Sequence, residues 1–251
     1  MNRALRFALG GLLALAACVP TDDGARSPRY TLIMGIDVSG SFRNSGSYDD
    51  AVRFAAHYLE AHLNGFGGLQ VPTDVFVGSV GGSRQGEAKA FHPKHDFLGK
   101  DQAEIESNLR EWFPSEDQLT DFNTFFTQAA DLVNQRGLVL APLNMVLFTD
   151  GVPDVPRGSE VENAYASIDV SPLEYLSRSV TIRVLYPTPT VASNWRSGVA
   201  RRRVRLWTQD AEVMKGWDAQ FRPELAMEEQ ELLWTWVLDN VDFRVRRERI
   251  L

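Results

Sequence analysis

Acidic and hydroxyl side chains follow strongly apolar stretches of the chain at spacings that would bring oxygen atoms together. Asp37, Ser39 and Ser41 occupy alternate positions of a D-x-S-x-S motif after one such stretch, and Asp150 precedes a glycine after another. Thr120 stands at the start of a predicted helix. Mg²⁺ takes about six oxygen ligands and shares its shell with hydroxyl groups and water. These five residues therefore predict a site for Mg²⁺, with Mn²⁺ and Ca²⁺ as alternatives.

Each part of this pattern also has a simpler interpretation. Serine often caps a helix, and aspartate often forms a turn, above all in Asp-Gly. The joint order and spacing of the parts favour the metal site over these interpretations. His92 and His95 form a second candidate pair. Pro93 interrupts any helix between them and no cysteine accompanies them, so we interpret them as exposed loop residues.

The elements that must position these residues alternate between strand-like and helix-like segments. Nearly continuous apolar runs indicate strands buried on both faces, and apolar residues at helical spacing indicate helices that cover them. Such alternation predicts one α/β domain with a mostly parallel sheet, whose ligands gather at the carboxyl ends of the strands. The predicted buried strands are 30–38, 71–80, 180–186 and a strand that includes 145–148, and Gly81-Gly82 ends the second of them. The predicted edge strands are 88–92 and 203–207. The predicted helices are 48–63, 101–113, 121–135, 172–178 and 224–240.

With these motifs on their strands, the sequence resembles the von Willebrand factor A (vWA) domain family, which has a Rossmann-like fold. The resemblance covers about residues 30–210, and we expect the rest of 30–251 to close the same domain. It implies a metal-ion-dependent adhesion site (MIDAS) in which Asp37, Ser39, Ser41, Thr120 and Asp150 hold the metal. Thr124 is the alternative to Thr120.

A cation held mostly by neutral hydroxyl groups keeps surplus positive charge and an open coordination position. It would therefore accept a carboxylate from outside, such as an exposed Asp or Glu of a protein partner. The sequence thus predicts metal-dependent protein binding rather than catalysis. In one alternative the chain is a structural or assembly lipoprotein in which metal only stabilises the loops.

A metal-dependent hydrolase on a similar fold is the other alternative. A strand followed by a catalytic aspartate is typical of haloacid-dehalogenase-like phosphatases, but those enzymes need a second acid two residues later. Ser39 stands at that position, so general acid catalysis lacks its expected residue. The sequence also contains no G-x-S-x-G, phosphate-loop or H-E-x-x-H motif.

The N-terminal segment indicates export and lipid anchoring. Arg3 and Arg6 precede the apolar run 7–17, which has the length of a signal-peptide core. The following Leu-Ala-Ala-Cys resembles the lipobox of bacterial lipoproteins, and Cys18 is the only cysteine. We therefore expect a signal peptide over 1–17, a lipid on Cys18 and a flexible tether over 18–29. The alternative is ordinary cleavage with an incidental cysteine.

This resemblance implies a protein of the bacterial cell envelope, attached to a membrane through Cys18. Val19 rather than aspartate follows the cysteine. In enterobacteria-like sorting this favours the periplasmic side of the outer membrane over the inner membrane.

Composition limits the remaining classes of function. The 251 residues are 44% apolar and 24% charged, as in soluble globular proteins rather than disordered or multi-span membrane proteins. The net charge is −7 for the full sequence and −9 once residues 1–17 are removed, and this acidity argues against nucleic acid as a partner. Two basic clusters stand out, at 201–205 and 244–249. They suit an acidic partner or lipid head groups, or are merely solvated charges.

Overall fold

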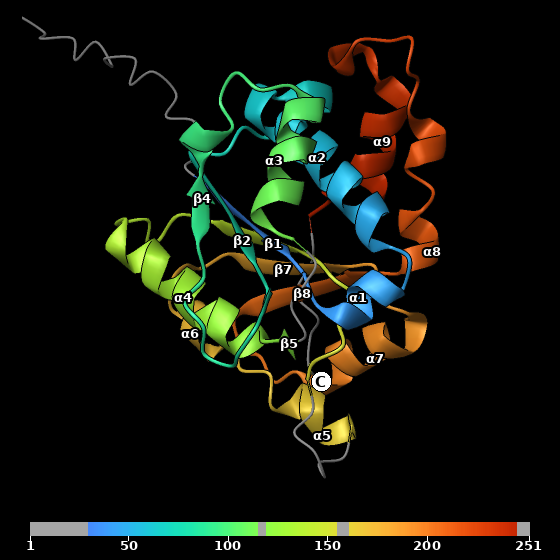
Figure 1. Cartoon of the computed structure of the whole chain (residues 1–251). Helices are drawn as coiled ribbons and strands as arrows, with labels where there is room; N and C mark the ends of the chain where they lie inside the picture. The colour runs from blue at the N-terminus through green and yellow to red at the C-terminus, as the bar shows by residue number, and fades with distance from the viewer. Residues whose placement is uncertain (1–29, 115–118, 155–160, 245–251) are drawn as a thin grey trace, which may run out of the picture.

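The computed structural model describes residues 30–114, 119–154 and 161–244 (Figure 1). The predicted signal peptide 1–17, Cys18 and the predicted tether 18–29 lie outside these residues, as do Arg246, Arg247 and Arg249. Among the helices in these ranges, none is both long enough and apolar enough to cross a lipid bilayer.

A six-stranded sheet forms the centre of the described chain, with strand order β4-β2-β1-β6-β7-β8. Its neighbouring strands run parallel except at one edge, where β4 is antiparallel to β2. The predicted α/β class with a mostly parallel sheet is thus confirmed. The strands are β1 (Thr31–Ile36), β2 (Asp74–Ser79), β4 (Phe91–Pro93), β6 (Leu143–Phe148), β7 (Val180–Leu185) and β8 (Val204–Gln209).

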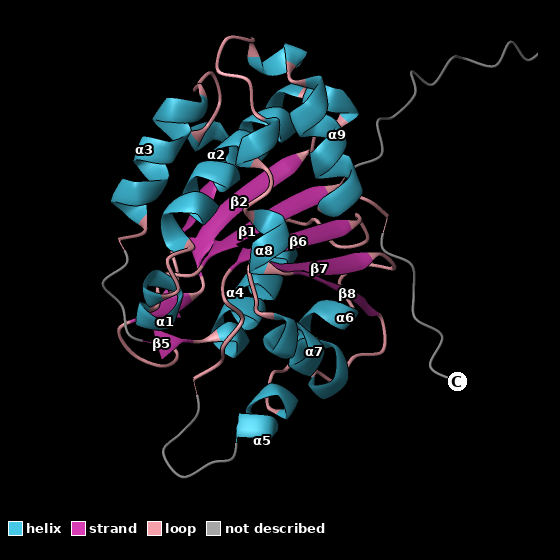
Figure 2. Cartoon of the chain, turned by 90° about the vertical axis from the view of Figure 1, so that its right-hand side faces the viewer, coloured by secondary structure: helices cyan, strands magenta, loops and turns pink. Residues whose placement is uncertain are grey.

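Helices cover both faces of this sheet (Figure 2). On one face lie α1 (Gly40–Asn44), α2 (Tyr48–Asn64), α3 (Gln102–Trp112), α8 (Ala211–Met214) and α9 (Glu231–Asn240). On the other face lie α4 (Phe122–Gln135), α5 (Val161–Ala166), α6 (Ser171–Glu174) and α7 (Pro189–Gly198). Short 3₁₀ turns occupy η1 (Phe66–Gly68), η2 (Lys94–Asp96), η3 (Asp218–Gln220) and η4 (Met227–Glu229), and a separate two-stranded ladder joins β3 (Gly81–Gly82) to β5 (Leu119–Thr120).

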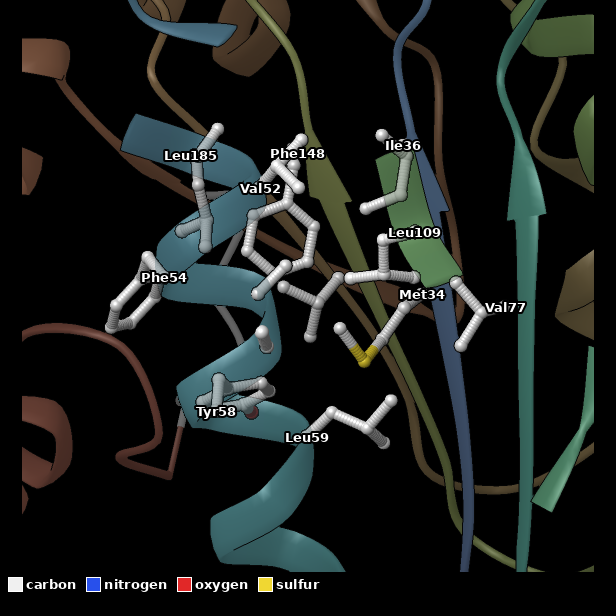
Figure 3. Close-up of a cluster of buried hydrophobic side chains, with 14 of the residues drawn as sticks. Met34, Ile36, Val52, Phe54, Tyr58, Leu59, Val77, Leu109, Phe148 and Leu185 are labelled. Carbon is white, nitrogen blue, oxygen red and sulfur yellow. The ribbon is translucent and has the colours of Figure 1, made fainter. Parts of the chain in front are cut away.

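Two apolar cores hold these layers together. Figure 3 shows the first, in which side chains of the sheet meet those of α2. Met34 and Ile36 of β1 belong to this core, whereas Ile33 belongs to the core on the opposite face. Successive strand side chains point to opposite faces. A strand covered on both sides therefore needs an apolar residue at nearly every position, which explains the continuous apolar run from which β1 was predicted.

Local signals set the ends of the predicted helices. The prediction over 101–113 corresponds to α3, which begins with a reciprocal capping box between Asp101 and Glu104. The prediction over 48–63 corresponds to α2, which ends at Gly65 in a left-handed conformation. The short edge strand predicted over 88–92 is displaced to β4, at 91–93.

The helix predicted over 224–240 begins later, at Glu231. Its expected first turns are replaced by a loop and the 3₁₀ turn η4, next to the buried side chain of Gln230. The Gln230 amide accepts a hydrogen bond from the Arg222 N–H (2.9 Å) and donates to the carbonyl oxygens of Arg222 and Leu225. These bonds satisfy the backbone in place of helical hydrogen bonds, so the apolar spacing upstream of 231 was misleading.

Candidate metal centre

The two predicted acidic positions lie at the ends of adjacent parallel strands. Ile36 of β1 pairs with Phe148 of β6, and the Asp37 N–H continues the ladder by donating to the Phe148 carbonyl at 3.0 Å. Asp37 and Asp150 therefore leave the sheet side by side at the same edge, which we call the carboxyl edge. The ladder between β1 and β6 fixes this arrangement, although 113 positions separate the two residues in the sequence.

Asp37 is fully buried, and each of its carboxylate oxygens accepts a hydrogen bond. Oδ1 accepts from the backbone N–H of Ser39 at 2.9 Å, and Oδ2 accepts from the hydroxyl of Thr149. Burial raises the pKa of Asp37 to about 6, and the nearby charge of Asp150 adds to this rise, while the hydrogen bonds from Thr149 and Ser39 oppose it.

The two serines link Asp37 to Asp150. The Ser39 Oγ lies 3.2 Å from the Ser41 Oγ, and Ser41 is exposed at the first turn of α1. Ser39 is also the N-cap of this unpredicted helix, because its Oγ accepts from the Phe42 N–H at 3.5 Å. The simple capping interpretation of Ser39 is therefore correct as well. Because Ser39 caps the start of α1, the Ser41 hydroxyl lies in the first turn of that helix.

Asp150 is buried, and its Oδ1 accepts a hydrogen bond from the Val152 N–H at 3.0 Å. Burial raises the pKa of Asp150 above its ordinary value, and the charge of Asp154 adds to the rise, while hydrogen bonds from the Val152 N–H and the Ser41 hydroxyl oppose it. Ser41 therefore lies beside this carboxylate. Gly151 follows with φ of 72°, and a Cβ there would lie 2.8 Å from the Trp195 Nε1. The same indole donates to the Gly151 carbonyl at 2.7 Å, so this close packing requires the glycine of the Asp-Gly pair.

Thr120 reaches the carboxyl edge through the small ladder between β3 and β5. Thr120 pairs with Gly81, where a Cβ would lie 2.8 Å from the Leu119 carbonyl oxygen and 3.3 Å from the Ser39 backbone nitrogen. A glycine at 81 thus lets β5 approach the D-x-S-x-S segment. As predicted, the strand before Gly81-Gly82 ends there, with β2 stopping at Ser79, and the two glycines form the separate strand β3 that pairs with β5.

The side chain of Thr120 is buried, and its backbone N–H donates to Asp154. The described contacts of Asp37, Ser39, Ser41 and Asp150 connect those four side chains to one another, whereas Thr120 joins them through backbone proximity.

Thr124, the alternative ligand, has another role. Its hydroxyl donates to the Asp121 Oδ2 at 2.7 Å, and its N–H donates to the Asp121 Oδ1 at 3.0 Å. Asp121 is the N-cap of α4, so Thr124 completes a helix start. The Gly86 N–H also donates to Asp121, and these bonds outweigh its burial and lower its pKa.

Thr149 and Asp154 are site residues that the sequence analysis missed. Thr149 precedes Asp150 in the motif, and its Oγ1 both donates to Asp37 and accepts from the Gly151 N–H at 2.9 Å. Its position in Phe-Thr-Asp-Gly was an available signal. Asp154 is exposed overall, but partial burial of its carboxylate and the charge of Asp121 raise its pKa, while the hydrogen bond from the Thr120 N–H opposes the rise. Its contact with Thr120 joins residues 34 positions apart in the sequence, so the spacing of neighbouring residues could not predict it.

The charge balance of this edge is unusual for two buried acids. In residues 30–114, 119–154 and 161–244, no Lys, Arg or His lies within ion-pair distance of Asp37 or Asp150. The groups gathered here that could bind a cation are two carboxylates and hydroxyl groups. Among the described residues, no group of three or more His, Cys, Asp or Glu side chains is placed to hold a metal ion. Such an all-oxygen set suits hard cations such as Mg²⁺, Mn²⁺ and Ca²⁺.

His92 and His95 both contact Asp96, but in the described parts of the chain no group of three or more His, Cys, Asp or Glu side chains is placed to hold a metal ion. His92 was predicted to be an exposed loop residue and is instead a half-buried residue of β4. The His92 ring stacks on Trp112 with centroids 3.9 Å apart and planes 4° apart, and its Nδ1 lies 3.3 Å from Asp96. His95 is exposed and also lies beside Asp96.

A pocket of about 310 Å³ opens beside Thr120. Its described lining includes Thr120, Asp121, Phe122, Asp154 and Ile168. Of the five candidate ligands, Thr120 is the one among the pocket's described lining residues.

Comparison with known proteins bears on the fold. No protein-family model and no curated protein sequence matches the chain. The pilus adhesin SpaC from Lactobacillus rhamnosus GG superposes with a TM-score of 0.50 at 12% identity, over 85% of this chain and 30% of its own. Proximal thread matrix protein 1 from the mussel byssus superposes with a TM-score of 0.45 at 12% identity, over 84% of this chain and 47% of its own. That mussel protein is also known with a zinc-occupied MIDAS motif.

The VWA domain of SpRpn10 superposes with a TM-score of 0.42 at 12% identity, over 80% of this chain and 93% of its own. The superposition on SpaC, the strand order and the helical layers agree with the predicted α/β fold with a mostly parallel sheet. At such identities these likenesses concern the fold alone. The chain spans less than half the length of the SpaC and mussel chains.

Proposed function

We propose that this protein is a lipid-anchored component of a bacterial cell envelope that binds a protein partner through a divalent cation. The cation would be held by Asp37, Ser39, Ser41, Thr120 and Asp150. The observation that carries the proposal is the connected group of oxygen atoms at the carboxyl edge, in which the Ser39 and Ser41 hydroxyls lie 3.2 Å apart.

The chemistry of the donor set supports a resident cation. The charge of Asp150 raises the pKa of Asp37, so these two buried carboxylates repel, and neither has a basic partner among the described residues. A dication would relieve that repulsion. Hydroxyl ligands add oxygen atoms without adding negative charge. A bound Mg²⁺ would supply residual positive charge at this edge, and Ser41, which is exposed, marks the side from which a partner would approach.

The arrangement supports recognition of an acidic group. A carboxylate of an exposed Asp or Glu on the partner would be attracted to the cation, and the pocket beside Thr120 offers room for neighbouring groups of the same partner. SpaC is a pilus adhesin, and an adhesive role for this chain is part of the present proposal.

The observations favour binding over hydrolysis. Ser39 occupies the position where a phosphatase of the competing type carries its second acid, and it is committed to capping α1. A hydrolase would show substrate turnover that Asp37→Ala abolishes, and such turnover would contradict this proposal.

The test is capture of envelope proteins by the mature chain in Mg²⁺ and in EDTA. The proposal predicts a partner that is retained in Mg²⁺, is lost in EDTA and is lost with Asp37→Ala. Asp239→Ala, which removes an exposed acid of α9, serves as the matched control and should retain it. Changing the partner's contacting Asp or Glu to its amide should abolish capture. Capture indifferent to EDTA would indicate a structural role for the loops instead.

The lipid anchor is tested separately. Labelled palmitate supplied to cells should enter the protein and should be absent after Cys18→Ser. Labelling that persists in this variant would contradict acylation of Cys18, without bearing on the metal centre.

A further inference from the structure

Exposed apolar side chains and arginines gather at the opposite end of the sheet from the candidate metal centre, where β6, β7 and β8 begin. Leu140 is 78% exposed and Tyr175 is 73% exposed. The Leu140 N–H donates to the Leu176 carbonyl at 2.7 Å and joins the loop before β6 to the segment before β7. These residues therefore share one surface.

Arginines surround these apolar side chains. The Arg203 guanidinium lies over the Tyr175 ring, 5.8 Å from its centroid, and Arg136 and Arg178 are exposed in the adjoining loops. Within the described residues, none of these three arginines forms an ion pair. We call this surface the amino-edge patch; it comprises Arg136, Val139, Leu140, Tyr175, Arg178 and Arg203.

The fold gains little from the side chain of Leu140. Its φ of 78° lies in the left-handed region that favours glycine and asparagine, and the side chain is not buried. A leucine with this backbone conformation is strained, and its exposed side chain adds no packing within the protein that would offset the strain. We therefore infer that its apolar surface contacts another molecule or a membrane.

The start of the described chain lies at the same edge. The Thr31 N–H donates to the Pro142 carbonyl at 2.9 Å, next to the loop that carries Leu140. Residues 19–29 join this point to Cys18. Even fully extended, such a segment spans no more than ~40 Å. A lipid on Cys18 would therefore keep the amino edge close to the bilayer.

We propose that the amino-edge patch rests on an anionic membrane surface, with Leu140 and Tyr175 among the head groups and the arginines at lipid phosphates. The amphipathic ring of tyrosine suits the membrane interface, and guanidinium groups bind phosphate oxygens in pairs. Without Arg3 and Arg6 of the predicted signal peptide the mature chain has a net charge of −9, which repels an anionic bilayer elsewhere, so the basic edge is the one that faces it. The proposed lipid anchor supplies proximity, and to that extent this inference rests on the proposed function.

This orientation has a consequence for the metal centre. The six-residue strands β1 and β6 separate the two edges of the sheet by ~20 Å. With the amino edge on the membrane, Asp37 and Asp150 face away from it, toward proteins in the adjoining space.

The test is flotation of the mature chain, made without acyl groups and with Cys18→Ser, on two kinds of vesicle. Binding should occur on vesicles containing phosphatidylglycerol and be much weaker on vesicles of phosphatidylcholine alone. Leu140→Asn together with Tyr175→Ser should weaken binding at least tenfold. Asparagine tolerates the left-handed conformation, so thermal unfolding should show that this variant is folded. Arg178→Gln and Arg203→Gln should each weaken binding about fivefold.

Two control variants change the same residue types elsewhere. Arg84→Gln alters an exposed arginine after β3 at the carboxyl edge, and Leu238→Asn alters an exposed leucine of α9. Both should bind like the parent chain. Equal binding by parent and patch variants would overturn the inference, as would patch-dependent dimerisation in sedimentation without lipid. The assay involves neither metal nor acylation, so its failure is distinct from failure of the proposed function.

Discussion

The hydroxyl of Thr149 donates a hydrogen bond to the carboxylate of Asp37 and thereby ties the end of β6 to the end of β1. The bond joins two loops that meet only because their strands are adjacent in the sheet. It holds one carboxylate oxygen in place, while the Ser39 N–H holds the other. The oxygen atoms of the candidate metal centre are thus ordered by the fold itself.

Asp37→Asn should stabilise the metal-free protein at pH 8. Burial raises the pKa of Asp37 to about 6, so its contribution to stability is present below its ordinary pKa near 3.8 and is lost as the pH rises through 6. Removing the buried charge should raise the free energy of unfolding by about 1–3 kcal/mol at pH 8. Near pH 4 the variant and the parent should be alike. Urea unfolding in EDTA at both pH values measures this, and a variant less stable than the parent at pH 8 would contradict it.

Thr120 and Thr124 should respond differently to replacement by valine. Thr120→Val should weaken metal binding roughly tenfold or more, as loss of a ligand or of its support does. Thr124→Val removes the 2.7 Å hydrogen bond to the cap of α4, so it should lower stability by about 1 kcal/mol and leave metal affinity unchanged. Titration calorimetry and urea unfolding separate the two effects. The reverse result would make Thr124 the ligand.

Gly81→Ala should damage the site although it changes no polar group. Its Cβ would lie 2.8 Å from the Leu119 carbonyl and 2.9 Å from Val38, which would force β5 away from the D-x-S-x-S segment. We expect a loss of about 1–3 kcal/mol of stability and weaker metal binding. Gly40→Ala is the matched control because a Cβ there meets nothing within 4 Å. Similar behaviour of the two variants in thermal unfolding would show that this close approach does not matter.

Glu60→Gln should change how stability depends on pH. Burial raises the pKa of Glu60 to about 7, and the charges of Asp101 and Glu228 add to the rise. Its Oε2 has no hydrogen-bond partner among the described residues. The stability that Glu60 contributes is full below its ordinary pKa of 4.5 and is lost as the pH rises through 7.

The glutamine variant should therefore exceed the parent by about 2 kcal/mol at pH 8 and match it near pH 4. The measurement is the free energy of unfolding across this pH range. Glu111→Gln, at an exposed position of α3, should leave the pH profile unchanged. A Glu60 variant that keeps the parent's profile would show that the carboxyl is not desolvated.

The buried strands and most helices of this fold could be predicted from the spacing of apolar residues. The loops and short elements that complete the candidate site depend on contacts between residues far apart in the sequence. The buried strands could be predicted because a sheet covered on both faces demands continuous apolar runs, as in β1. The D-x-S-x-S and Thr-Asp-Gly motifs follow such runs, so their meeting at one edge follows from parallel pairing.

The helix α1 was missed because its five residues carry no apolar stripe. The late start of α9 depends on a side-chain amide, Gln230, that replaces helical hydrogen bonds. The contact between Asp154 and Thr120 joins a loop to β5, and the pairing of Gly81 with Thr120 joins β3 to the same strand across a long stretch of sequence. Those relationships are set by tertiary packing, which residue spacing does not encode.

The central claim is tested most directly by thermal unfolding of the mature chain with Mg²⁺, Mn²⁺ or Ca²⁺, and with EDTA. At a free metal concentration about a thousand times Kd, binding adds about 4 kcal/mol to the free energy of unfolding. The parent chain and Asp239→Ala should both show this increase with at least one of the three cations, and Asp37→Ala should show none. A parent chain whose unfolding is the same with each cation and with EDTA, or an Asp37→Ala variant that keeps the full increase, would contradict a cation at this edge.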